Sequence, residues 1–80
     1  MTDPLPDSDD TLDARGLLCP LPVLKAARRM RALPAGGVLR LLADDPAALV
    51  DVPHYCAESG AALLAQTDEE GAQAYYLRKG

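Results

Sequence analysis

A cysteine followed by two closely spaced prolines is the feature of this sequence that points most directly to chemistry. Cys19 stands just before a predicted helix, and Pro20 and Pro22 fall within its first turn. Proline costs little at the first helical position, because the N–H that it lacks would have had no intrahelical acceptor there. We therefore expect Cys19 to be the N-cap and Pro20 to open the helix, with the amides of Leu21 and Val23 facing the cap.

The N-terminus of a helix would make this cysteine unusually acidic. It carries roughly half a positive charge, which favours an anion such as a thiolate. If that charge contributes about 1.4 kcal/mol, the pKa of Cys19 falls by about one unit from ~8.5, and the thiolate fraction at pH 7 rises from roughly 3% to roughly 25%. Arg15 could lower the pKa further if its loop folds back. The pattern predicts an exposed nucleophile. The alternative is a small apolar residue packed beneath a loop.

Length and charge restrict the classes of protein that this chain could represent. Eighty residues with a formal net charge of −4 indicate one small domain without general affinity for nucleic acid. No apolar run is long enough to span a membrane, and the acidic N-terminus does not resemble a signal peptide. We expect a cytoplasmic monomer, with residues 1–9 as a disordered acidic tail and residues 10–80 as the folded domain.

Two cysteines and one histidine are too few for a disulfide framework or a zinc site, so no metal or other cofactor is expected. The segment Asp44-Asp45-Pro46 is interpreted as a helix start with Asp45 as the cap. A metal-binding pair of carboxylates is its alternative. Cys56 is expected to be a buried structural thiol, with a resolving cysteine as the alternative. His54 is expected to lie on the surface.

Hydrophobic periodicity predicts four strands and two helical segments. Pro53 cannot lie deep inside a regular helix, so the second segment is expected to be interrupted, with a turn at 46–49 and a new start capped by Asp51. The first helix has a basic face, which is either simply solvated or docks an acidic partner. Its cations are Lys25, Arg28 and Arg29. The expected strands are 11–14, 38–43, 61–67 and 72–78, and the first helix is 20–33.

The order of these elements, βαβαββ, indicates an α/β two-layer sandwich. Its four-stranded mixed sheet would have both helices on one face. The first two strands are expected to be parallel, because a βαβ crossover joins them. The last two strands should form an antiparallel hairpin around an acidic turn. The second face of the sheet would be open to solvent or to a partner.

The segment TLDARGLLCPLP, at 11–22, resembles the signature of the TusA/SirA-like sulfur carriers, whose hallmark is Cys-Pro-x-Pro at the start of the first helix. The ADDP run at 43–46, the DVP run at 51–53 with Cys56 after it, and the closing YLRKG run at 76–80 are similar to the second half of that family. The resemblance covers about residues 11–80. One departure is Leu21, because the family often has a charged residue between the two prolines, beside the reactive sulfur.

The resemblance implies a fold like that of the C-terminal domain of a bacterial translation initiation factor. It also implies that Cys19 carries sulfur as a persulfide, with Arg15, Pro20 and Pro22 as supporting residues. A cysteine desulfurase or a rhodanese-type protein would load it, and an acceptor protein of the TusD or DsrE type would unload it. In this family the sulfur can enter 2-thiouridine of tRNA, the molybdenum cofactor or sulfur oxidation.

The residues themselves are compatible with a carrier. The chain has no Gly-rich phosphate loop, metal set or substrate-pocket motif that would indicate a self-contained enzyme. Two other interpretations remain open at this point. One is a non-catalytic interaction module in which the cysteine is incidental. The other is a redox-sensing thiol domain in which Cys19 is oxidised and Cys56 resolves it.

Overall fold

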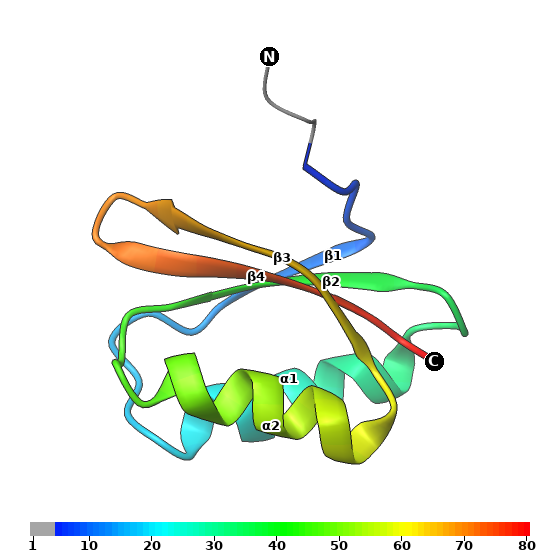
Figure 1. Cartoon of the computed structure of the whole chain (residues 1–80), viewed down its shortest axis with the longest axis horizontal. Coiled ribbons are helices and arrows are strands. Elements are labelled where there is room, and N and C mark those ends of the chain that lie inside the picture. The colour runs from blue at the N-terminus through cyan, green and yellow to red at the C-terminus, as the bar shows by residue number, and fades with distance from the viewer. Residues whose placement is uncertain (1–4) are drawn as a thin grey trace.

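The computed structural model describes residues 5–80 and contains four strands and two helices in the expected order (Figure 1). The first four residues of the predicted acidic tail lie outside the described residues. Two strands begin and end as predicted, and the other elements differ by one or two residues at their ends, except at the start of the second helix. The bounds are β1 Asp10–Asp13, α1 Leu21–Ala32, β2 Val38–Ala43, α2 Ala48–Ser59, β3 Ala62–Glu69 and β4 Ala72–Arg78.

The sheet is mixed, as predicted, with the strand order β1-β2-β4-β3. β1 lies parallel to β2, with Leu12 opposite Leu41, while β4 lies antiparallel to both β2 and β3. The last strand of the chain therefore occupies an interior position. The hairpin turn between β3 and β4 is made by Glu70 and Gly71, both of which have positive φ, as a two-residue hairpin of this kind requires.

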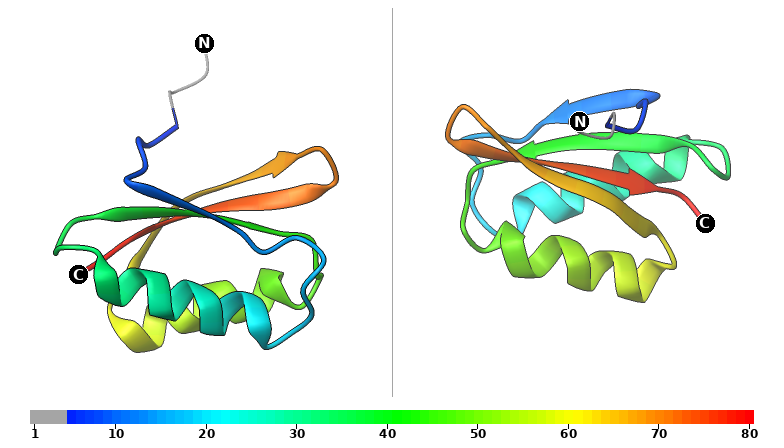
Figure 2. Two further views of the ribbon diagram at one scale, coloured as in Figure 1. Left: turned by 180° about the vertical axis from the view of Figure 1, so that it is seen from behind. Right: turned by 45° about the horizontal axis from the view of Figure 1, so that its top comes forward.

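Both helices cover the same face of the sheet (Figures 1 and 2). The core lies between the layers, and its largest fully buried side chains are those of Tyr75, Leu39, Leu41, Leu77 and Val52. The expectation of an open second face is only partly met. Val38, Leu42, Ala74 and Tyr76 form a small buried cluster. Arg40, which is hydrogen-bonded to Tyr76 Oη and ion-paired with Glu69, belongs to the same side of the sheet.

The second helix is continuous, so the predicted interruption is wrong. α2 runs through Pro53, and Asp51 lies in its first turn rather than at its cap. The proline removes the donor that the carbonyl of Leu49 would use, one turn earlier. Leu49 is exposed, so water can satisfy that carbonyl. The helix ends at Gly60, which has a φ of 80°.

The two helices begin at the same end of the molecule (Figures 1 and 2). The C-terminus lies at the opposite end, where Lys79 Nζ donates to the carbonyl oxygens of Leu33 and Arg31. At the start of the domain, the Asp9 amide donates to the Val38 carbonyl, and its carboxylate accepts from the Val38 amide. Within residues 5–80, no helix has both the length and the apolar character needed to cross a membrane.

Candidate functional site

Cys19 lies in the loop that joins β1 to α1, one residue farther from the helix than predicted. Pro20 is the N-cap, and its carbonyl accepts the first intrahelical bond, from the Leu24 amide at 3.1 Å. Pro22 therefore occupies the second helical position. The Leu21 amide, expected to face the cap, donates instead to the Leu18 carbonyl at 2.9 Å. The peptide bond between Cys19 and Pro20 is cis.

The loop is held in place by the acidic pair that follows β2. Because β1 and β2 are parallel, the loops after both strands leave the sheet at the same end. The Gly16 amide donates to Asp44 Oδ1 at 2.9 Å, and the Cys19 amide donates to Asp45 Oδ2 at 2.6 Å. Asp45 Oδ1 accepts from the Ala47 amide at 3.1 Å. Asp45 therefore caps the turn that leads into α2, whereas the N-cap of α2 itself is Ala47, which forms no side-chain cap bond. Asp45 also binds the cysteine loop, which was not predicted.

These bonds give the acidic pair a structural role, because both carboxylates hold the cysteine loop in place. The position of the two residues is explained without a bound metal ion. An oxygen of each carboxylate already accepts a backbone N–H. Among residues 5–80, no group of three or more potential ligand side chains is arranged to hold a metal ion.

The side chain of Cys19 is exposed and unbonded to any other cysteine, as predicted. It opens onto a groove of about 230 Å³ between α1 and α2, and Val23 and Tyr55 contribute to the walls. Asp51, His54 and Glu58 also line this groove. The spacing of residues 51, 54, 55 and 58 places them on one helical face, but Asp51 was expected to be a cap and so was not assigned to that face.

The prediction of a lowered thiol pKa is wrong for the free protein. A hydrogen bond from the thiol to the Asp51 carboxylate raises the pKa of Cys19. Desolvation raises it further, followed by the negative charges of Asp51 and Asp45. The helix N-terminus offers less to the sulfur than expected, because the Leu21 amide, which was expected to face it, donates to the Leu18 carbonyl. Sequence spacing does not show that two carboxylates from a later segment would lie beside the thiol.

Arg15 does not fold back toward the cysteine. Its Nε and Nη2 donate to the two carboxylate oxygens of Asp13 at 2.9 and 2.8 Å. This two-point contact lowers the pKa of Asp13 to about 2, with the side-chain hydrogen bond as its main cause. The cation is therefore engaged with Asp13, at the end of β1.

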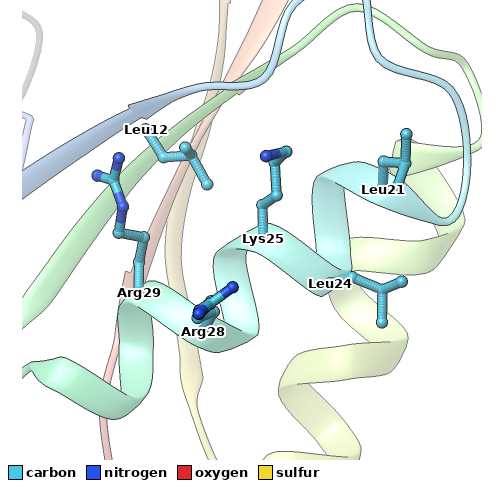
Figure 3. Close-up of a pocket in the computed structure, with 6 residues that line it drawn as sticks. All are labelled: Leu12, Leu21, Leu24, Lys25, Arg28 and Arg29. Carbon is cyan, nitrogen blue, oxygen red and sulfur yellow. The ribbon is translucent and has the colours of Figure 1, made fainter.

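The basic face of α1 borders a second groove, of about 300 Å³ (Figure 3). Leu12, Leu21 and Leu24 provide its apolar part, and three cations line the rest. They differ in their partners. Arg29 is ion-paired with Asp10 at 3.1 Å, whereas neither Lys25 nor Arg28 forms an ion pair within residues 5–80. All three were candidate docking residues on a face that could also be simply solvated, and two of them form no ion pair within the described residues.

The remaining candidate residues take the places expected for them. Cys56 is only 5% exposed and packs in the main core, where burial raises its thiol pKa. The side chain of His54 is 70% exposed, and its Nε2 lies 3.1 Å from Glu58 Oε1, one helical turn along α2.

Comparison with known proteins agrees with this geometry. The family model described as sulfurtransferase TusA matches residues 10–79. The sulfur carrier protein TusA of Pseudomonas entomophila (strain L48) is 46% identical over 79 residues, which cover 99% of this chain and 96% of that protein. Its counterpart in Pseudomonas syringae pv. syringae (strain B728a) is 45% identical over 71 residues, covering 89% and 84%.

A solved structure extends the agreement to three dimensions. The crystal structure of a SirA-like protein from Desulfitobacterium hafniense superimposes with a TM-score of 0.78 at 26% identity. The match covers 89% of this chain and 97% of the other. Since sequence, family model and fold all agree along nearly the whole length, the chain belongs to the TusA sulfurtransferase family.

Proposed function

We propose that this protein is a sulfur carrier that holds one sulfur atom as a persulfide on Cys19 and passes it between proteins. The observation that carries the proposal is the exposed thiol of Cys19 at the start of α1, in a chain of this family. The name of its Pseudomonas relatives, sulfur carrier protein, supports the same role. The carrier would act in the cytoplasm, where thiols stay reduced.

Loading is a thiol exchange. The sulfur of Cys19 attacks the outer sulfur of a donor persulfide, a new S–S bond forms on Cys19, and the S–S bond of the donor breaks. The donor cysteine leaves as a thiolate and takes up a proton, which balances the proton lost from Cys19. Unloading repeats the exchange with a cysteine of the acceptor. No external oxidant is needed, because the outer sulfur keeps its oxidation state throughout.

The surroundings of Cys19 suit a carrier whose thiol should react with its protein partners and not with small electrophiles in solution. Asp51 and Asp45 raise the pKa of the thiol, so the protonated form prevails at neutral pH in the free protein. The thiolate is the attacking species, so reaction with small electrophiles is slowed. We infer that ionisation of Cys19 is promoted when a partner docks.

We propose a cysteine desulfurase or a rhodanese-type protein as the donor, and a cysteine-bearing protein of the TusD or DsrE type as the acceptor. Arg15, Pro20 and Pro22 would then act through the shape of the loop rather than through contact with the transferred sulfur. Pro20 caps α1 and Arg15 binds Asp13. Three destinations remain consistent with such a relay, namely thiolated tRNA, the molybdenum cofactor and sulfur oxidation.

The test is to incubate the purified protein with a cysteine desulfurase and L-cysteine and to measure its intact mass. We expect the mass of one added sulfur atom, removed by a reductant. The gain should be absent from Cys19→Ser and preserved in Cys56→Ser, because Cys56 is buried. A gain that persists in Cys19→Ser would refute the assignment. An interaction module would gain no sulfur, and a redox sensor would form a Cys19–Cys56 disulfide under peroxide.

A further inference from the structure

Exposed apolar side chains are concentrated at the end of the molecule that carries Cys19. Among the described residues, seven large hydrophobic side chains are exposed, and five of them lie in the loop before α1 or in the first turns of the two helices. These five are Leu18, Leu21, Leu24, Leu49 and Val50. Leu18, next to the cysteine, is 71% exposed. Such a concentration on a small domain marks an interaction surface.

Positive charge flanks this apolar surface on the β1 side of α1. Leu21 and Leu24 continue into the groove of Figure 3, where Lys25 and Arg28 extend from the same helix. Neither cation has an ion-pair partner within residues 5–80. Both are therefore free to bind carboxylates of another protein without first breaking a contact.

Negative charge flanks the surface on the α2 side. Asp51 and Glu58 line the groove onto which Cys19 opens. Asp51 forms no ion pair within the described part of the chain, and the partner of Glu58 is the neighbouring His54. The first turn of α1 thus separates a basic groove from an acidic one, with the reactive sulfur on the acidic side.

We propose that the protein that exchanges sulfur with Cys19 presents a complementary surface. Around its own reactive sulfur it has apolar side chains, with a carboxylate on the side that meets Lys25 and Arg28 and a lysine or arginine on the side that meets Asp51 and Glu58. This inference rests on the proposed function and adds the chemistry of the partner. Opposite charges on the two flanks admit one docking orientation, because the reversed one would bring like charges together.

This arrangement also accounts for the protonated thiol of the free protein. A partner cation placed beside Asp51 would offset the negative charge that raises the pKa of Cys19. Attack would then become favourable only in the docked complex. The same contact that orients the partner would thereby release the nucleophile.

The test compares charge-reversed variants with a protein donor and with a small donor. The protein donor is a cysteine desulfurase, with L-cysteine, that loads the wild-type chain, and the small donor is glutathione persulfide. We expect Lys25→Glu/Arg28→Glu to slow loading by the desulfurase at low salt by about tenfold, through loss of steering and contact. The control, Arg31→Glu at the far end of α1, reverses one charge rather than two and should stay within about twofold. Glutathione persulfide should load all three proteins at similar rates.

The acidic flank has its own pair of variants. Glu58→Lys should slow loading by the desulfurase, whereas Asp68→Lys, in the β3–β4 hairpin, should not. Equal effects of each variant and its control would overturn the proposal, as would a loss confined to one flank. Failure of the wild-type chain to gain sulfur from either donor would instead refute the carrier function itself.

Discussion

Replacing Asp45 should separate the structural role of the acidic pair from the effect of its charge. Asp45 uses both carboxylate oxygens at once, one for the Cys19 amide and one for the Ala47 amide. Asparagine has only one acceptor oxygen, so Asp45→Asn can keep only one of these bonds. Asp44 accepts only through Oδ1, from Gly16, and Asp44→Asn can keep that bond. The two substitutions remove the same charge from adjacent positions, and they differ in the number of bonds lost.

The expected magnitudes follow from this difference. A hydrogen bond to a charged group contributes about 1.5–3 kcal/mol when it is shielded from water, and less where water can replace the partner. Asp45 is half-buried and the Cys19 loop is exposed, so we assign about 1 kcal/mol to each bond. Asp45→Asn should then lower the free energy of unfolding by about 1 kcal/mol and Asp45→Ala by about 2 kcal/mol. Asp44→Asn should change it by less than about 0.5 kcal/mol.

Urea unfolding followed by far-UV circular dichroism suits this measurement, since the chain has no tryptophan. With a urea slope of about 1–2 kcal/mol/M, a loss of 1 kcal/mol lowers the unfolding midpoint by roughly 0.5–1 M urea, which is readily resolved. The slope of the transition should stay constant, because neither side chain organises the core. Equal unfolding midpoints for Asp45→Asn and Asp44→Asn would refute the reasoning that Asp45 joins the cysteine loop to α2.

Three other predictions follow from single side chains. Asp51→Asn should shift the pH profile of Cys19 alkylation by iodoacetamide to lower pH, because its carboxylate is the largest cause of the raised thiol pKa; an unchanged profile would contradict that assignment. Tyr75→Phe should stabilise the protein by about 1 kcal/mol in urea, because the buried Tyr75 hydroxyl has no hydrogen-bond partner among the described residues; a clear loss of stability would show that the hydroxyl is satisfied. Asp13 has a pKa of about 2 in the folded protein, below the ordinary value near 3.9, so its contribution to stability is present above that ordinary value and disappears as the pH falls through about 2. In unfolding measured at a series of pH values, the difference in stability between wild type and Asp13→Asn should shrink over that interval. A constant difference would count against the Arg15 contact.

The sequence was sufficient for the architecture because each element carries a pattern of its own. The apolar run Val38–Ala43 and the alternating run Ala72–Arg78 both became strands with the expected bounds. The two misplaced features concern prolines. Proline at 20 is equally compatible with a cap and with a first helical residue, and Pro53 was tolerated because the carbonyl that it leaves without a donor belongs to an exposed residue.

The position of the reactive cysteine could be predicted from the sequence, but the charged groups that surround it could not. The identity and exposure of Cys19 follow from its place beside two prolines. Its ionisation depends on Asp45 and Asp51, which lie 26 and 32 positions later in the chain and approach it only through the parallel pairing of β1 with β2 and the packing of α2. Charges brought together by tertiary structure leave no trace in local spacing, so a helix-end argument alone gave the wrong direction for the pKa.

The C-terminus lies at the end of the molecule opposite the Cys19 loop (Figure 1). A fluorescent label, an affinity tag or a whole second protein could therefore be joined after Gly80 through a flexible linker without crowding the proposed docking surface around Cys19. The geometry makes this small domain suitable as a reporter in a reconstituted relay, because the proposed docking surface and the site of detection would lie at opposite ends of the molecule.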